Sequence, residues 1–198
     1  MIKKLLNYSS LYNLSMNFLG GANSRKKFLS DYVSFSPNYK VLDLGCGTAQ
    51  ILSLLSNVEY TGIDASQDYI NTAQKRFANG KFICSYFDET TKLDGKYDLV
   101  LALGLIHHMD AKTSKNLITN ACNILKEGGK LITFDNVLFQ GQNLLTRWII
   151  KQDRGNYIRN LREYTSLFPQ DIFKNIQFDL REDLLRIPYT HVVSICTK

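Results

Sequence analysis

Two glycines and a carboxylate lie at the spacing of a site for a nucleotide-like ligand. Gly45 and Gly47 come directly after an apolar run and before a helix-like segment, so the backbone there can turn tightly and approach a ligand closely. Asp64 ends the next apolar run, 19 residues after Gly45. A carboxylate at that place can accept hydrogen bonds from both hydroxyls of an adenosine ribose. The pattern predicts a ribose-binding crevice beside a glycine loop.

A second carboxylate distinguishes between two classes of ligand. The dinucleotide fingerprint G-x-G-x-x-G would need a third glycine at position 50, where this chain has Gln50. Asp43 stands inside the first apolar run, beside the loop, where it would repel a pyrophosphate but could orient the loop or attract an ammonium group. The residues therefore favour a ligand with an amino-acid end, and S-adenosylmethionine is such a ligand.

Four ordered segments resemble the class I S-adenosylmethionine-dependent methyltransferases. Val41 to Ala49 is similar to motif I of that family, D/E-x-G-x-G-x-G, with Ala49 in place of the third glycine. Residues 60–66, 97–110 and 125–131 are similar to its second acidic motif, its strand-four motif with a trailing His-His, and its L-K-P-G-G segment. The resemblance implies a Rossmann-like fold, S-adenosylmethionine as cofactor and methyl-transfer activity.

The last third adds a second, looser resemblance. An Asp-Arg-Gly segment at 153–155 and the run R-I-P-Y-T-H at 186–191 look like a bacterial methyltransferase subgroup of small-molecule type, whose substrate is unsettled. Arg154, Arg159 and Arg186 could recognise a carboxylate, a phosphate or a sugar acid. Solvated helix faces and ion pairs are the alternative for these arginines.

Positions that match the family's motifs supply the expected cofactor contacts. These are Asp43, Gly45, Cys46, Gly47, Asp64, Ala65, Ser85, Tyr86, Phe87 and Leu103. One position departs from the family, which often has an aspartate for the adenine amino group where this chain has Tyr86. We therefore expect aromatic packing and backbone contacts to hold the adenine, unless a shifted loop brings Asp88 into that role.

Candidates for proton transfer follow the fourth and fifth apolar runs. His108 lies at the end of the fourth run and Asp135 near the end of the fifth, and either could deprotonate a hydroxyl or an ammonium acceptor. A carboxylate acceptor would need no base. Helix capping or core packing is the alternative for His108, and core packing is the expected role of His191. The cysteines, at 46, 84, 122 and 196, lack metal-ligand spacing, so we expect no metal site.

The elements that position these residues alternate between strand-like and helix-like segments. Strands are expected at residues 39–44, 58–63, 81–84, 97–103 and 130–134, with helices at 48–56, 66–77 and 113–125. Helices at 142–152 and 159–168 and strands at 176–180 and 191–196 follow. This predicts an α/β fold: a Rossmann-like, doubly wound, mostly parallel seven-stranded sheet with a terminal antiparallel strand pair.

An N-terminal helical extension is expected before the sheet. Residues 1–36 space apolar side chains helically, and we expect a lid over the crevice of the methyltransferase domain at 37–198, within a single domain. A peripheral membrane-surface helix and ordinary core packing are the alternatives. No apolar run approaches the length of a transmembrane helix, and polar residues interrupt the N-terminal apolar stretch, which makes it a poor signal peptide. Widely spaced cysteines favour the cytoplasm.

The formal net charge of +6 is unevenly distributed along the chain. Residues 1–40 carry +5, residues 41–136 carry −2 and residues 137–198 carry +3. Because the positive segments flank the crevice, we predict O- or N-methylation of a small, polar or anionic acceptor. The alternatives are a tRNA or rRNA methyltransferase that uses the basic ends, and a non-catalytic module that binds an adenosyl ligand. Nucleic acid is the less favoured partner, DNA base methylation is disfavoured, and the oligomeric state stays open.

Overall fold

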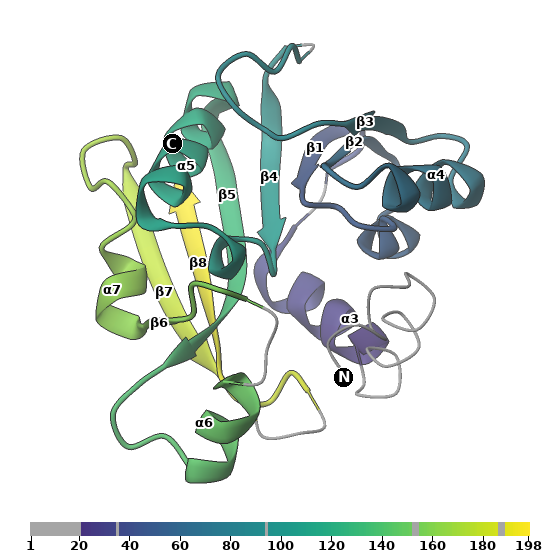
Figure 1. Ribbon diagram of the computed structural model, residues 1–198. Coiled ribbons are helices and arrows are strands. Elements are labelled where there is room, and N and C mark those ends of the chain that lie inside the picture. Colours follow the sequence, from purple (N-terminus) through teal and green to yellow (C-terminus); the bar gives the residue numbers. More distant parts are fainter. Residues whose placement is uncertain (1–20, 35, 94, 152–154, 186–188) are drawn as a thin grey trace.

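The protein is a mixed sheet flanked by helices. In this computed structural model the described residues are 21–198 without 35, 94, 152–154 and 186–188. The sheet has the strand order β3-β2-β1-β4-β5-β8-β7, and a two-residue strand, β6, pairs with β5 outside that path. The first five strands of the order are parallel, whereas β8 runs antiparallel between β5 and β7 (Figure 1). The predicted mostly parallel sheet with a terminal antiparallel pair is confirmed.

The bounds of the elements follow the chain order. The strands are β1 Tyr39–Leu44, β2 Val58–Asp64, β3 Lys81–Cys84, β4 Tyr97–Leu103, β5 Leu125–Leu138, β6 Arg159–Asn160, β7 Asn175–Arg181 and β8 His191–Thr197. The helices are α3 Gly21–Tyr32, α4 Gln67–Arg76, α5 Ala111–Ile124, α6 Leu144–Lys151 and α7 Leu161–Thr165, with 3₁₀ turns η1 Gln50–Leu54 and η2 Ile106–His108.

The central strands are apolar throughout because both faces of the sheet are covered. Leu42 and Leu44 of β1 belong to one core cluster, with α5 and α7, while Val41 belongs to a second cluster with α3 and α4. Alternate residues of β4 divide in the same way between the two clusters. A strand buried on both faces shows a continuous apolar run instead of alternation, which is the pattern in the sequence.

Three elements differ from the sequence expectation. The helix expected at 48–56 is the short 3₁₀ turn η1, because Ala49 before it takes a left-handed conformation with φ of 53°. β5 begins at Leu125 instead of residue 130, and its register against β4 shifts before Lys130, so the expected turn at 127–129 is an irregularity within the strand. The helix expected at 159–168 begins with the strand β6 and is confined to α7.

Part of the expected N-terminal extension lies outside the described residues. Residues 1–20 are not described, and of the segment 1–36 the structure defines the helix α3. The ring of Phe28 lies 5.8 Å from that of Phe134 on β5, and Asp31 forms an ion pair with Arg181 at the end of β7. α3 therefore packs against β5 and forms an ion pair with the end of β7. Within the described residues, no helix combines the length and the apolar content needed to cross a bilayer.

Candidate functional site

The glycine loop after β1 depends on two left-handed residues. Gly45 has φ of 67° and Gly47 has φ of 54°, a region that side chains other than glycine rarely adopt. A Cβ atom on Gly45 would lie 2.8 Å from Cδ1 of Leu105, whereas one on Gly47 would meet nothing within 4 Å. Gly45 therefore allows close packing against the segment after β4, and Gly47 faces open space.

Asp64 fixes this loop. One oxygen of its carboxylate, Oδ2, accepts the backbone N–H of Gly47 at 2.8 Å, and the other, Oδ1, accepts that of Ser66 at 2.8 Å. Ser66 is the N-cap of α4, as predicted. Each carboxylate oxygen offers two acceptor positions, so both keep one for a ligand hydroxyl. The arrangement fits the ribose of an adenosyl ligand.

Asp43 lies beneath the loop and does not face the crevice. Its side chain is buried, with 3% of the residue exposed, and Oδ2 accepts a hydrogen bond from the Tyr60 hydroxyl at 2.6 Å. Burial raises the pKa of Asp43 to about 7, although the bond from Tyr60 opposes that shift. Cys46 is buried nearby, its backbone N–H donates to Ile63 O, and burial raises the pKa of its thiol. Both residues support the loop from below.

The segment after β3 is brought to the same edge of the sheet. Cys84 is paired with Asp64 in the β2–β3 register, and the backbone N–H of Ser85 donates to the Asp64 carbonyl at 3.0 Å. Tyr86 is 77% exposed, whereas Phe87 packs partly buried against the core. An exposed aromatic residue thus follows β3, the strand that pairs with β2 and Asp64.

The remaining predicted contact residues also lie along this edge. Ala65 is exposed directly after Asp64, and Leu103, partly buried, ends β4. Asp88 accepts hydrogen bonds from the backbone and side chain of Thr90, so it closes a local turn. Asp88, the alternative residue for the adenine, is thus hydrogen-bonded within this turn.

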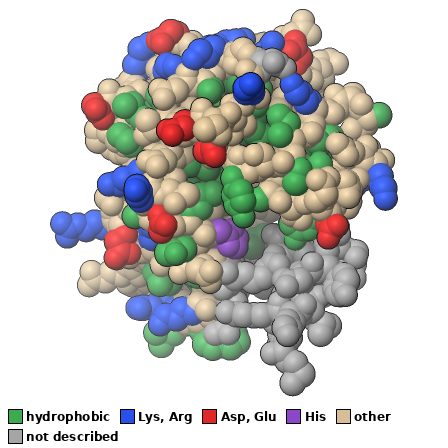
Figure 2. Space-filling view, turned by 45° about the horizontal axis from the view of Figure 1, so that its top comes forward, with side chains coloured by type: hydrophobic (Ala, Val, Ile, Leu, Met, Phe, Trp, Pro, Cys, Tyr) green, Lys and Arg blue, Asp and Glu red, His purple; other side chains and the backbone are tan. Residues whose placement is uncertain are grey.

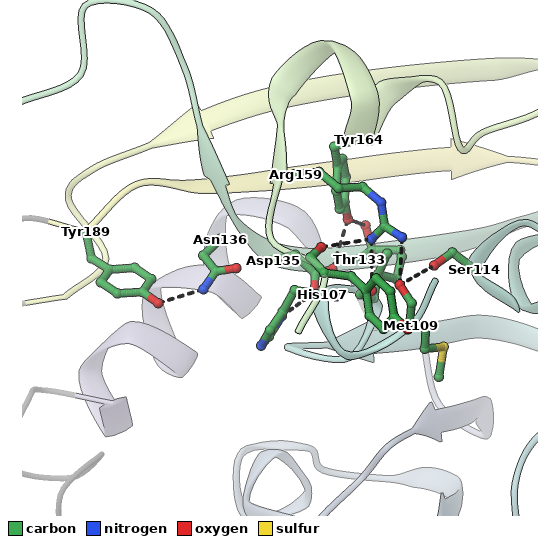
Figure 3. A network of polar contacts seen from close by, with 11 residues as sticks. His107, Met109, Ser114, Thr133, Asp135, Asn136, Arg159, Tyr164 and Tyr189 are labelled. Carbon is green, nitrogen blue, oxygen red and sulfur yellow. Dashed lines mark hydrogen bonds and ion pairs between the residues drawn. The ribbon is translucent and has the colours of Figure 1, made fainter. Parts of the chain in front are cut away.

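Asp135 pairs with His107. The Asp135 carboxylate is buried, and its Oδ1 lies 2.8 Å from Nδ1 of His107 and 3.1 Å from the His107 backbone nitrogen. Its Oδ2 accepts a hydrogen bond from Tyr164 Oη at 2.9 Å, and that hydroxyl lies 2.8 Å from Thr133 Oγ1. In Figure 3 the other ring nitrogen of His107 points away from Asp135. Such a pair fixes the tautomer of the imidazole.

The backbone around His107 is held by a buried arginine. Arg159 donates from Nη1 to Ile106 O at 3.2 Å and from Nη2 to Met109 O at 2.6 Å, and the backbone of Tyr157 donates to His107 O at 3.0 Å. Arg159, which the sequence had offered for acceptor recognition, is therefore engaged within the protein (Figure 3). His108 is exposed and its ring centroid lies 4.2 Å from that of His107.

A pocket lies beyond the end of β5. It has a volume of about 420 Å³ and is lined by Phe139, Gly141, Gln142, Asn143, Thr146, Glu182 and Tyr189. The Tyr189 hydroxyl accepts a hydrogen bond from Asn136 Nδ2 at 2.7 Å, and Asn136 directly follows Asp135 (Figure 3). The wall of this pocket is thus hydrogen-bonded to the residue that follows Asp135 along β5.

Several of these residues were not anticipated from the sequence. Tyr164, Thr133 and Asn136 carry no motif, and only their position on or beside β5 could have suggested them. Tyr189 lies in the R-I-P-Y-T-H run, but no role of its own was predicted for it. His191 is the packed histidine that the sequence predicted, with 4% exposed and its ring stacked on Phe134 at 4.2 Å. Among the described residues, no three side chains of His, Cys, Asp or Glu cluster as metal ligands.

Comparison with known proteins agrees with this geometry. Residues 41–129 match the family described as the methyltransferase domain, and the segment contains the glycine loop, Asp64 and His107. These residues form a class I S-adenosylmethionine-dependent methyltransferase domain. The terminal antiparallel pair, which follows this segment along the chain, continues the same sheet.

Curated relatives of this methyltransferase domain differ in their acceptors. The chain is 27% identical over 130 residues to a probable tRNA methyltransferase 9B of Mus musculus, over 62% of this chain and 28% of that protein. It is 25% identical over 189 residues to a phosphoethanolamine N-methyltransferase of Triticum aestivum, over 92% of this chain and 37% of that protein. The matches thus span well under half the length of these two relatives.

Solved structures share the fold of the methyltransferase domain. The plantazolicin methyltransferase BpumL, in complex with a desmethyl plantazolicin analogue and S-adenosylhomocysteine, superposes with a TM-score of 0.69 and 17% identity. The match covers 96% of this chain and 89% of that structure. The two proteins therefore share their architecture over nearly the whole of both chains.

Proposed function

We propose that the protein transfers the methyl group of S-adenosylmethionine to a hydroxyl or amine of a small polar acceptor. The observation that carries this proposal is the buried His107–Asp135 pair, which lies at the same edge of the sheet as the Asp64-anchored glycine loop. A cofactor crevice and a positioned imidazole are the two parts that methylation of a protic group requires.

The cofactor side of the proposal rests on the loop and the strand ends. The backbone of Gly45 and Gly47 would contact the methionyl end, Asp64 the ribose, and Tyr86 the adenine. S-adenosylmethionine supplies a methyl group that its sulfonium already makes electrophilic. The protein's main task is then to hold the acceptor in line with it.

The acceptor side of the proposal assigns the proton to His107. Asp135 accepts from Nδ1 of that ring, so Nε2 is the basic nitrogen that takes a proton from the acceptor's O–H or N–H. Asp135 is a positioning residue in this scheme, and His108 has no part in the proton transfer. A carboxylate acceptor would make no use of the pair, which favours O–H and N–H acceptors.

The remaining assignments belong to the same proposal. We propose residues 37–198 as the methyltransferase domain and the segment 1–36, of which 1–20 lie outside the described residues, as its lid. The wheat relative, named for a small-molecule acceptor, matches 92% of this chain, whereas the mouse tRNA methyltransferase relative matches 62%. That difference in coverage favours a small acceptor over tRNA. We propose the cytoplasm as its location, in line with the widely spaced cysteines.

The test is transfer of a labelled methyl group to molecules of a cell extract. We expect His107→Gln to lower the yield of labelled product at least about 100-fold, which is the ordinary contribution of a general base. His108→Gln, an equally conservative change at the neighbouring exposed ring, should stay within about threefold of the wild type.

The products separate the alternatives. Mass spectrometry should find the label on a small molecule that carries a methylated oxygen or nitrogen. Label recovered in RNA would overturn the acceptor assignment, and full activity of His107→Gln would overturn the role of the pair. Cofactor binding without transfer to any molecule of the extract would point to a non-catalytic binding module.

A further inference from the structure

The outward face of α6 is hydrophobic. Leu144, Leu145 and Trp148 are 81%, 54% and 62% exposed, whereas Thr146 and Ile150, on the opposite side of the same helix, are 2% and 0% exposed. A surface helix normally buries its apolar residues and presents polar ones to water. The inner face of α6 is therefore buried against the rest of the protein, whereas its outer face exposes large apolar side chains to water.

The cluster differs from ordinary scattered surface residues. Other large hydrophobic residues that are exposed in the described part of the chain, Tyr86, Tyr157 and Leu180, lie on separate elements. Leu144 and Trp148 are one helical turn apart, and Leu145 stands beside them, so the three form one continuous patch. Contiguous apolar patches on a protein surface mark sites of interaction.

Positive charge accompanies the patch. Arg147 and Lys151 are exposed on α6, one turn from each other and three residues from Leu144 and Trp148 respectively. Residues 136–152 contain these two basic residues and no aspartate or glutamate. Hydrophobic and basic side chains gather at the lower edge of the molecule in Figure 2, where α6 lies in Figure 1.

We propose that α6 binds the surface of an anionic lipid bilayer. Leucine and tryptophan side chains beside arginine and lysine are the composition of a helix that lies in the membrane interface, with its apolar face among the acyl chains and its cations at the lipid phosphates. The long stems of Arg147 and Lys151 let the charged groups reach the headgroups while the apolar residues insert. This surface goes beyond the methyl-transfer proposal and does not depend on it.

Membrane binding through α6 would also orient the pocket beyond β5. Gln142 and Asn143, just before the helix, and Thr146, in its first turn, line that pocket. A molecule docked through Leu144, Leu145 and Trp148 therefore holds the pocket close to the plane of the headgroups.

The experiment uses the one tryptophan of the chain, Trp148, as the reporter. The full-length protein is titrated with vesicles of phosphatidylcholine alone or mixed with phosphatidylglycerol, and binding is measured by tryptophan emission and by co-sedimentation. We expect the emission to shift to shorter wavelength, with binding that is stronger on the anionic vesicles and weakens as salt is added.

Variants assign the effect to the patch. Leu144→Gln/Leu145→Gln, which keeps the reporter, should lower the partition coefficient at least about tenfold. Arg147→Gln/Lys151→Gln should remove the preference for anionic vesicles. The matched controls are Leu180→Gln, an exposed leucine on β7, and Lys112→Gln/Lys115→Gln, exposed lysines on α5, and both should bind as the wild type does. Circular dichroism confirms that each variant is folded.

Three results would overturn the proposal. The first is an unchanged tryptophan emission on anionic vesicles, or equal binding by Leu144→Gln/Leu145→Gln. The second is the emission of a buried indole in the absence of vesicles at all protein concentrations, which would mean that the chain itself covers the patch. The third is an emission shift that appears with rising protein concentration alone, which would assign the surface to a second copy or to another protein.

Discussion

Asp43 is a carboxylic acid whose burial favours its neutral form. Burial raises its pKa from 3.8 to about 7, and the Tyr60 hydroxyl is its hydrogen-bond partner. Because the folded protein binds this proton more tightly than the unfolded chain, the contribution of Asp43 to stability is fully present below pH 3.8 and is lost as the pH rises to about 7. At neutral pH the carboxyl group of Asp43, beneath the loop, is therefore close to its pKa.

Asp43→Asn should remove this pH dependence. The amide stays neutral at every pH. The free energy of unfolding of the variant, relative to that of the wild type, should therefore rise by on the order of 1–3 kcal/mol between about pH 5 and about pH 8. Urea denaturation at the two pH values measures it, with Asp68→Asn, an exposed acid of α4, as the control. Parallel pH profiles for wild type and Asp43→Asn would contradict the burial argument.

At this scale the sequence indicated the candidate residues of the site more readily than the groups they contact. Asp64, Gly45 and Gly47 follow from the spacing of glycines and acids along two strands. The choice of His107 over His108 does not follow from the spacing. Both residues lie in η2, a single 3₁₀ turn, which is too short for a sequence pattern to predict where each side chain points. Asp135 could be proposed as an acid near the crevice, but its partner depends on the β4–β5 register.

At the scale of elements, the loop between β1 and η1 is the most constrained connection of the site. Gly45, Gly47 and Ala49 all have positive φ, and Ala49 occupies the place of the third glycine in the family motif. An alanine in this region costs roughly 1 kcal/mol, so the loop stores strain that a glycine would not. The departure from the motif therefore raises the energy of the turn.

Gly45→Ala should disrupt this loop more than its positive φ alone explains. The new Cβ would lie 2.8 Å from Leu105 Cδ1, so the clash adds to backbone strain. We expect a loss of roughly 2–4 kcal/mol in the free energy of unfolding and loss of stabilisation by S-adenosylhomocysteine, both read from thermal denaturation. Gly95→Ala, with φ of 81° and nothing within 4 Å, isolates the strain and should cost about 1 kcal/mol. Equal losses in the two variants would refute the clash.

Elements bounded by clear local signals were predicted with their ends. β3 and β4 have the predicted limits, and Ser66 caps α4 through its side chain. β5 and β6 could not be predicted so well, because their extent is set by pairing with β4 and β8 and by the contact of Arg159 with the η2 backbone. Tertiary pairing of this kind leaves no local pattern in the sequence.

At the scale of the whole molecule, the positive charge of the last third is partly used inside the fold. Arg159 donates to backbone carbonyls, and Arg181 lies between Asp31 and Asp183. These two cations are engaged by groups of the chain itself, which weakens the sequence argument for an anionic acceptor. The basic residues that stay on the surface next to apolar ones, Arg147 and Lys151, lie on α6.

The central claim is that the glycine loop and Asp64 hold S-adenosylmethionine, and calorimetric titration with S-adenosylhomocysteine tests it most directly. The wild type should bind, and Asp64→Ala should bind at least about 100-fold more weakly, because it loses both the anchor of Gly47 and the acceptors for the ribose. Glu89→Ala, at an exposed acid beyond β3, should bind as the wild type does. No binding by the wild type, or equal affinity of Asp64→Ala and the wild type, would contradict the account.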